Sequence, residues 1–214
     1  MAMSMTVSSL GQTIITFSSL SGFNTAIGAG PVTVEDFTSS NHFPIITGIL
    51  NSLTNLVVTS GPAITPGLIQ PGVTYSTPVG SGNFFNIDSG GGFTGGFLDT
   101  VTSNGPLTIT FAGPVSAFGF DTSTIVGPSF AITINFTSGS PYTNTFSTVS
   151  TVPSFYGFQS TSTNISSVIV GGGTTQFTFA IDNFRFTSVP EPGTVWLMGG
   201  GVALLAVLYR RRAI

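Results

Sequence analysis

The chain has 214 residues, and only 5% of them are charged, against about 25% in an ordinary soluble domain. It contains no lysine and no cysteine, and its only basic residues are Arg185, Arg210, Arg211 and Arg212. Nucleic-acid binding is excluded because it needs clustered lysine and arginine, and the lack of cysteine excludes disulfides and cysteine-based metal sites. The 20 phenylalanines and the 41% hydrophobic content require a folded core rather than a disordered chain.

Residues 1–29 form a poorly defined N-terminal segment, and strand signals dominate from about residue 32 onward. The clearest strands are 107–111 and 131–136, where apolar residues alternate with threonine or asparagine, which is typical of a half-buried antiparallel strand. The predicted strands are 32–37, 55–58, 73–77, 84–88, 107–111, 117–121, 131–136, 155–159, 166–170 and 176–186. Turn clusters rich in glycine, serine and proline separate them. This pattern predicts an all-β protein, an antiparallel β-sandwich of jelly-roll type over residues 30–188.

The alternation also predicts which side chains fill the core. We expect eight residues to be largely buried: Phe111, Phe118, Phe120, Ile132, Ile134, Phe136, Phe179 and Phe184. In the last strand the apolar residues occupy odd positions up to Ile181 and even positions from Phe184, so the alternation slips at Asp182-Asn183. A slip of one residue predicts a β-bulge or a bend at that point.

The final segment, residues 189–214, has a different composition. It begins with Pro190-Glu191-Pro192, continues with the uncharged stretch 193–209 and ends in the basic tail 210–214. As a helix rising ~1.5 Å per residue, the uncharged stretch would reach about 25 Å, the short end of what a bilayer needs. We therefore predict one transmembrane helix over 193–209.

The arginines of this segment predict its orientation. Arg210, Arg211 and Arg212 should stay in the cytoplasm under the positive-inside rule, which leaves residues 1–188 outside it, in the cell envelope. That orientation needs an export signal, and residues 1–20 have no basic region and no long apolar run. We expect either a start upstream of Met1 or a trimmed or mispredicted reading frame.

The order of Pro190-Glu191-Pro192, an apolar span and a terminal arginine cluster resembles the PEP-CTERM family of exported bacterial proteins. The phrases at 114–121, 155–170 and 180–186 are also similar to ones that recur in the ectodomains of that family. The resemblance implies recognition by an exosortase, a membrane-embedded enzyme that cuts near the Pro-Glu-Pro motif. It further implies a Gram-negative host that makes exopolysaccharide, and a body that becomes surface-bound or secreted after processing.

Catalytic chemistry finds little support in the sequence. His42 is the only histidine and lies in no nucleophile motif, and Asp88, Asp99, Asp121 and Asp182 are scattered singly. We expect a non-catalytic surface or matrix protein, with the membrane, an exosortase and exopolysaccharide as partners and no nucleic acid. A carbohydrate-binding module is the alternative, and a glycoside hydrolase with a carboxylate pair is a third.

Two weaker sites follow from the likeness of the body to carbohydrate-binding jelly rolls. These often hold a structural calcium ion between the first and last strands, for which Glu35, Asp36 and Asp182 are the matching candidates. Calcium is the one cofactor that the sequence leaves open. Sugar binding would need an exposed aromatic platform, for which Tyr75, Tyr142 and Tyr156 are candidates.

Overall fold

The structure is a computed structural model, and it describes residues 6–9, 12–37, 43–46, 49–55, 64–77, 83–89, 93, 96–102, 106–126, 129–147, 152–171 and 177–187. In sequence order, the elements are β1 (Thr6–Ser9), β2 (Gln12–Phe17), α1 (Leu20–Ile27), β3 (Val32–Glu35), β4 (Phe43–Ile46), β5 (Ile49–Asn51), β6 (Val73–Ser76), β7 (Asn83–Ser89), β8 (Gly96–Thr102), β9 (Leu107–Val115), β10 (Ala117–Val126), β11 (Ser129–Phe136), β12 (Tyr142–Ser147), β13 (Ser154–Ser160), β14 (Ile165–Val170) and β15 (Phe177–Thr187). The predicted strand at 55–58 lies almost wholly outside the described residues.

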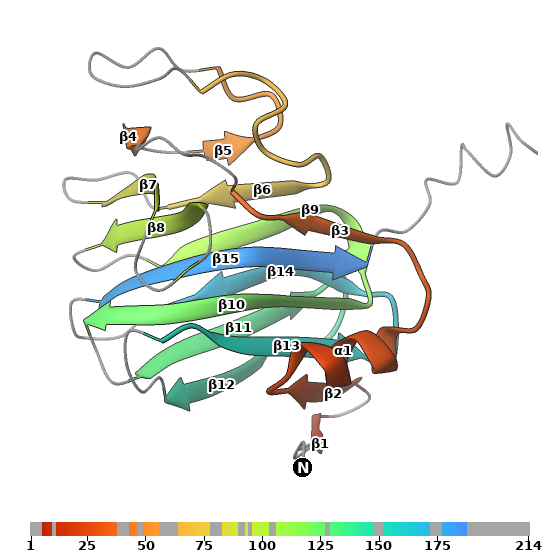
Figure 1. Cartoon of the computed structure of the whole chain (residues 1–214). Coiled ribbons are helices and arrows are strands. Elements are labelled where there is room, and N and C mark those ends of the chain that lie inside the picture. The colour runs from red at the N-terminus through yellow and green to blue at the C-terminus, as the bar shows by residue number, and fades with distance from the viewer. Residues whose placement is uncertain are drawn as a thin grey trace, which may run out of the picture.

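The strands form two sheets that pack face to face (Figure 1). The first sheet, called sheet A here, has the order β1-β2-β13-β10-β15-β8-β7-β4, with β3 also paired to β15. The second, sheet B, has the order β12-β11-β14-β9-β6-β5. The strand pairs are antiparallel, as between β10 and β13 and between β9 and β14. The predicted all-β antiparallel sandwich is confirmed.

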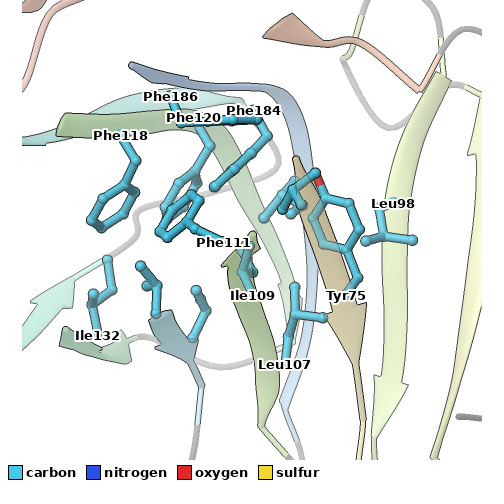
Figure 2. Packing of buried hydrophobic residues seen from close by; sticks show 14 of the residues in the cluster. Tyr75, Leu98, Leu107, Ile109, Phe111, Phe118, Phe120, Ile132, Phe184 and Phe186 are labelled. Carbon is cyan, nitrogen blue, oxygen red and sulfur yellow. The ribbon is translucent and has the colours of Figure 1, made fainter. Parts of the chain in front are cut away.

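Phenylalanine rings from sheet A fill much of the space between the sheets (Figure 2). Phe118 stacks on Phe158 with 4.9 Å between ring centroids, and Phe184 lies 6.2–6.3 Å from Phe120 and Phe118. Offset stacks of this kind add to the free energy gained by burying the rings. Six of the eight predicted core residues are buried, namely Phe111, Phe118, Phe120, Ile132, Ile134 and Phe184. Phe136 is only partly buried against the core, and the side chain of Phe179 lies outside the described part of the structure.

The N-terminal segment adds more order than its sequence predicted. Strand β2 pairs with β13, with Phe17 opposite Gly157, so sheet A includes residues that precede the predicted start of the sandwich at residue 30. Helix α1 follows, with the Ser19 side chain accepting a hydrogen bond from the Gly22 N–H as an N-cap. Its eight residues are too few for a helical periodicity to stand out in the sequence.

Helix α1 packs on the outer face of sheet A, where it covers a second and smaller apolar cluster. Phe23 of α1 lies beside Phe155 of β13, with 5.6 Å between ring centroids, and is fully buried. The rings fit because the strands beneath them carry glycine: a Cβ atom on Gly157 would lie 2.7 Å from Phe23 Cδ2, and one on Gly119 would lie 2.7 Å from Phe155 Cζ. These glycines allow rings to lie directly on the backbone of the sheet.

Candidate functional site

A β-bulge interrupts the pairing of β15 with β10. Gly119 pairs with Arg185, and Asp121 pairs with Asp182, so two residues of β15 lie opposite one residue of β10. Asn183 sits inside the bulge with φ of 49°, a left-handed conformation that asparagine tolerates better than most residues. The break predicted at Asp182-Asn183 is therefore confirmed. Because of the bulge, Ile181 and Phe184 both face the core although they are three residues apart.

The bulge joins two carboxylates through one amide. The Asn183 side-chain Nδ2 donates to Asp121 Oδ2 at 3.0 Å and to Asp182 Oδ2 at 3.1 Å, and the Asn183 backbone N–H donates to Asp182 Oδ1 at 2.6 Å. Asp182 is only 2% exposed. The pKa of Asp182 is raised to about 7, mainly by burial and to a smaller extent by the charges of Asp121 and Asp36, while the hydrogen bond from the Asn183 backbone and the charge of Arg185 oppose the shift.

Arg185 is the only basic residue in the described part of the chain, and it lies next to the bulge that contains Asp182 and Asn183. Its Nε donates to the Asn183 carbonyl at 3.1 Å, and its guanidinium lies 5.7 Å from the centroid of the Phe155 ring. Partial burial lowers the pKa of Arg185. The arginine therefore stabilises the bulge through a backbone hydrogen bond and a cation–π contact.

Glu35, the first of the calcium candidates, is committed to backbone groups. Its carboxylate accepts hydrogen bonds from the Phe37 N–H at 3.0 Å and the Gln70 N–H at 2.6 Å, and the residue is 1% exposed. Burial raises the pKa of Glu35, although both hydrogen bonds oppose the shift. This carboxylate ties the end of β3 to the loop before β6, and it stabilises the left-handed φ of 45° at Phe37.

Asp36 follows Glu35, which pairs with Phe184, so Asp36 lies beside the bulge that contains Asp182. Asp36 is exposed and Asp182 is buried. Within the described ranges, no group of three or more His, Asp or Glu side chains lies close enough together to hold a metal ion. Calcium binding stays a prediction.

The tyrosines do not form the exposed platform that sugar binding was expected to use. Tyr75 is fully buried between Phe37 and Phe184, and its hydroxyl has no hydrogen-bond partner. Tyr142 is 7% exposed, with its hydroxyl accepting from Asn144 Nδ2 at 3.2 Å. Tyr156 is partly buried and packs edge-on against two phenylalanine rings. These rings add to the core because β6, β12 and β13 turn them inward.

The outer face of sheet B carries aligned neutral polar side chains that the sequence reasoning did not single out as a site. Cross-strand pairing aligns one row that is polar throughout, Asn51, Thr74, Thr110, Ser167 and Asn135. It also aligns a second row, Ile49, Ser76, Thr108, Ile169, Thr133 and Thr143, in which two apolar isoleucines stand among the hydroxyl groups. Each of these residues is partly or fully exposed. The Asn135 amide donates to Ser167 Oγ at 3.0 Å, and the Thr133 and Thr143 hydroxyls lie 3.0 Å apart. The sequence did contain a signal for this polar face, because threonines alternate with core residues in β6, β9 and β11.

The C-terminal strand ends at a well-anchored residue. Thr187 Oγ1 accepts hydrogen bonds from the Ser116 and Ala117 backbone N–H groups, both at 3.1 Å, at the turn between β9 and β10. Its hydroxyl also lies 3.1 Å from Ser116 Oγ. The predicted sorting residues Pro190, Glu191 and Pro192, the span 193–209 and the arginines 210–212 lie outside the described residues. In the part of the chain that the structure describes, no helix is long and apolar enough to cross a membrane.

The segment after Thr187 matches a known family model, described as the PEP-CTERM protein-sorting motif, over residues 188–212. Residues 188–212 are a PEP-CTERM protein-sorting motif. The family resemblance of the tail is therefore confirmed. The PEP-CTERM motif begins directly after the last residue of β15, so no further described element separates it from the folded body.

No curated protein matches the chain in sequence. Among solved structures, the chain resembles an isomalto-dextranase from Arthrobacter globiformis T6 in complex with panose, with a TM-score of 0.37 and 14% identity. That match covers 83% of this chain but only 35% of the enzyme, so the chain spans about a third of its length.

The chain also resembles a family 11 carbohydrate-binding module from Clostridium thermocellum in complex with a mixed-linked tetrasaccharide, with a TM-score of 0.33 and 11% identity. That match covers 72% of this chain and 99% of the module. A solution structure of CtCBM11 matches with a TM-score of 0.34 and 14% identity, over 77% of this chain and 99% of that one.

Proposed function

We propose that this chain is an exported, non-catalytic protein of the cell surface or extracellular matrix, which an exosortase processes at Pro190-Glu191-Pro192. The observation that carries the proposal is the PEP-CTERM motif at residues 188–212, placed directly after the final strand of a folded body. Its sequence combines a proline-rich site, an apolar span and a basic end. The host is a Gram-negative bacterium, and the body is associated with exopolysaccharide.

The motif supplies two physical functions. The apolar span 193–209 partitions into the bilayer as a helix, and the arginines 210–212 hold its end in the cytoplasm. Each arginine costs ~2.5–3.5 kcal/mol at the bilayer centre on insertion scales. The Pro-Glu-Pro site then lies at the outer surface of the membrane, where its prolines keep the backbone extended for the enzyme.

The test is mass spectrometry of the exported protein, made with a signal peptide in a host that has an exosortase. We expect the mature protein to end near Pro192, and Glu191→Ala to leave an intact precursor in the membrane. A host strain lacking the exosortase is the control. Protein that ends at Ile214 equally in both strains would contradict exosortase processing.

The carboxylate pair at the bulge supports a structural rather than a catalytic function. Asp121 and Asp182 both accept hydrogen bonds from the Asn183 amide and so lie close together, and a glycosidase also needs two carboxyl groups near each other. Asp182 is 2% exposed, however, and a general acid must reach the substrate oxygen. The pair therefore shapes the bulge of β15 in the proposed non-catalytic protein.

A second candidate function is the binding of a neutral polysaccharide on the outer face of sheet B. The favouring observation is the aligned row Asn51, Thr74, Thr110, Ser167 and Asn135, in which every side chain carries a hydroxyl or an amide group and none is charged. Strands lie ~4.8 Å apart, so this row offers hydrogen-bonding groups at a regular spacing that an extended sugar chain can follow. A glycan array probed with the exported protein tests this function. Thr110→Glu should abolish binding to neutral glycans, and no binding by the unaltered protein would exclude it.

A further inference from the structure

The strand ends and turns that surround Thr187 form one end of the sandwich, called the tail end here. Val32 pairs with Thr187, Val115 pairs with Ile165, and the Thr137 N–H donates to the Asn164 carbonyl at 2.8 Å. Figure 1 shows the tip of β15, the start of β3 and the start of β10 at this same end. The exposed stretches there are 28–31, 112–114, 137–141 and 161–163.

The exposed stretches of the tail end carry no charged residue, whereas residues 1–188 as a whole have six acids and a single arginine, a net charge of −5. Asp182 lies five residues before Thr187 on β15, about 17 Å away along the strand, and Asp121 is paired beside it. Glu35 is closer but buried, and Arg185 lies over the Phe155 ring. Asp36 is exposed but lies four residues after Val32, about 13 Å along the chain, so none of these acids stands among the exposed stretches of the tail end.

The connection from this end to the sorting site is short. Only Ser188 and Val189 separate Thr187 from Pro190, and three residues of extended chain span at most about 11 Å. The connection cannot become longer by detaching Thr187 from the sheet without the loss of two hydrogen bonds, because two backbone N–H groups donate to its hydroxyl. A sorting site at the membrane surface consequently holds Thr187 within about 11 Å of the lipid headgroups, little more than the Debye length of ~8 Å at physiological salt.

We propose that the tail end of the sandwich lies against the lipid headgroups of the membrane while the sorting motif is still attached. This inference rests on the proposed insertion of the 193–209 span. A body with a net negative charge is repelled by anionic lipids, and the repulsion is smallest when its neutral end faces them. The same surface moves away from the bilayer once the motif is removed, because only the short connection keeps it there.

The absence of cysteine makes the test direct, since one introduced cysteine carries a unique label. The full chain is placed in vesicles of phosphatidylcholine and phosphatidylglycerol that contain a nitroxide-headgroup quencher, with a fluorophore at Ala112→Cys. The matched control carries the fluorophore at Val152→Cys, an exposed site (66%) before β13, about 25 Å along that strand from its end at Ser160. We expect at least threefold stronger quenching at position 112.

A spacer variant and a flotation assay separate the possible failures. Twelve Gly-Ser residues inserted after Ser188 reach about 20 Å, so quenching at position 112 should fall at least twofold. Equal quenching at the two positions, or no effect of the spacer, in protein that floats with the vesicles would overturn the inference and leave the membrane anchor intact. Protein that does not float would overturn the anchor and, with it, the inference.

Discussion

Gly157→Ala should destabilise the body by forcing apart the two rings that lie on β13. The added Cβ atom would lie 2.7 Å from Phe23 Cδ2 and 2.9 Å from Phe155 Cε1, whereas carbon atoms pack best at ~3.5–4.0 Å. The rings must therefore move by nearly 1 Å, and Phe23 is fully buried with neighbours on two sides. Overpacking of this kind costs ~1–3 kcal/mol, and replacing a strand glycine returns ~0.5–1 kcal/mol. With the middle of each range, the net loss is about 1 kcal/mol.

Thermal unfolding followed by circular dichroism measures this loss. In a domain of this size, ~1 kcal/mol corresponds to a shift of ~2–4 °C in Tm, so we expect Gly157→Ala to melt about 2–4 °C below the unaltered protein. Gly113→Ala is the matched control, because a Cβ atom there meets nothing within 4 Å. A Gly157→Ala variant that is as stable as the Gly113→Ala variant would refute the packing of α1 on the glycines of sheet A.

Three further predictions concern buried polar groups. The pKa of Asp182 is about 7 in the folded state and about 3.8 in the unfolded state, so the stability of the body should fall as the pH rises from 4 to 7. In urea unfolding, Asp182→Asn should make stability depend less on pH. An unchanged pH dependence would exclude Asp182 as its cause. Tyr75→Phe removes a hydroxyl that has no hydrogen-bond partner and should be neutral or stabilising by up to ~1 kcal/mol. Tyr142→Phe loses a hydrogen bond and should cost ~0.5–1 kcal/mol. The reverse order of stabilities would contradict the hydrogen bonding described for these two hydroxyl groups. Calcium, if Asp36 and Asp182 bind it, should raise the Tm of the protein but not that of Asp182→Asn, and no shift in the unaltered protein would exclude the site.

The alternation of apolar and polar residues was enough to predict most of the long strands and the bulge. In β9 and β11 the large apolar residues all occupy alternate positions, so only one face of each strand can be buried. At Asp182-Asn183 the apolar residues change from odd to even positions, which a strand accommodates by a β-bulge or a bend. Strand β13 is less informative, because Phe155, Tyr156 and Phe158 occupy both phases. Phe155 faces outward and is covered by α1, whereas Tyr156 faces the core between the sheets. Which face of β13 points inward therefore depends on α1, a helix too short for its periodicity to be recognised in the sequence.

The candidate sites were harder to predict than the strands, because burial decides the function of a polar residue. Tyr75 shares its phase with Val73, so the sequence did contain the signal that its ring is buried. Glu35 gave no such signal: its partners are backbone N–H groups, and one of them belongs to Gln70, 35 residues away. Contacts that join distant loops to a carboxylate leave no local pattern, whereas the sorting motif is continuous in sequence and needs no fold to be recognised.

The position of β15 within sheet A has a consequence for the timing of folding. This strand is the last of the body, yet it lies between β10 on one side and β8 and β3 on the other. Until residues 177–187 leave the export channel, β10 has an open edge and the core lacks Phe184 and Phe186. We expect the chain to stay unfolded and transportable until nearly all of it has crossed, and a chain truncated before Phe177 to remain sensitive to protease. Completion of the sheet then coincides with the arrival of the sorting motif at the membrane.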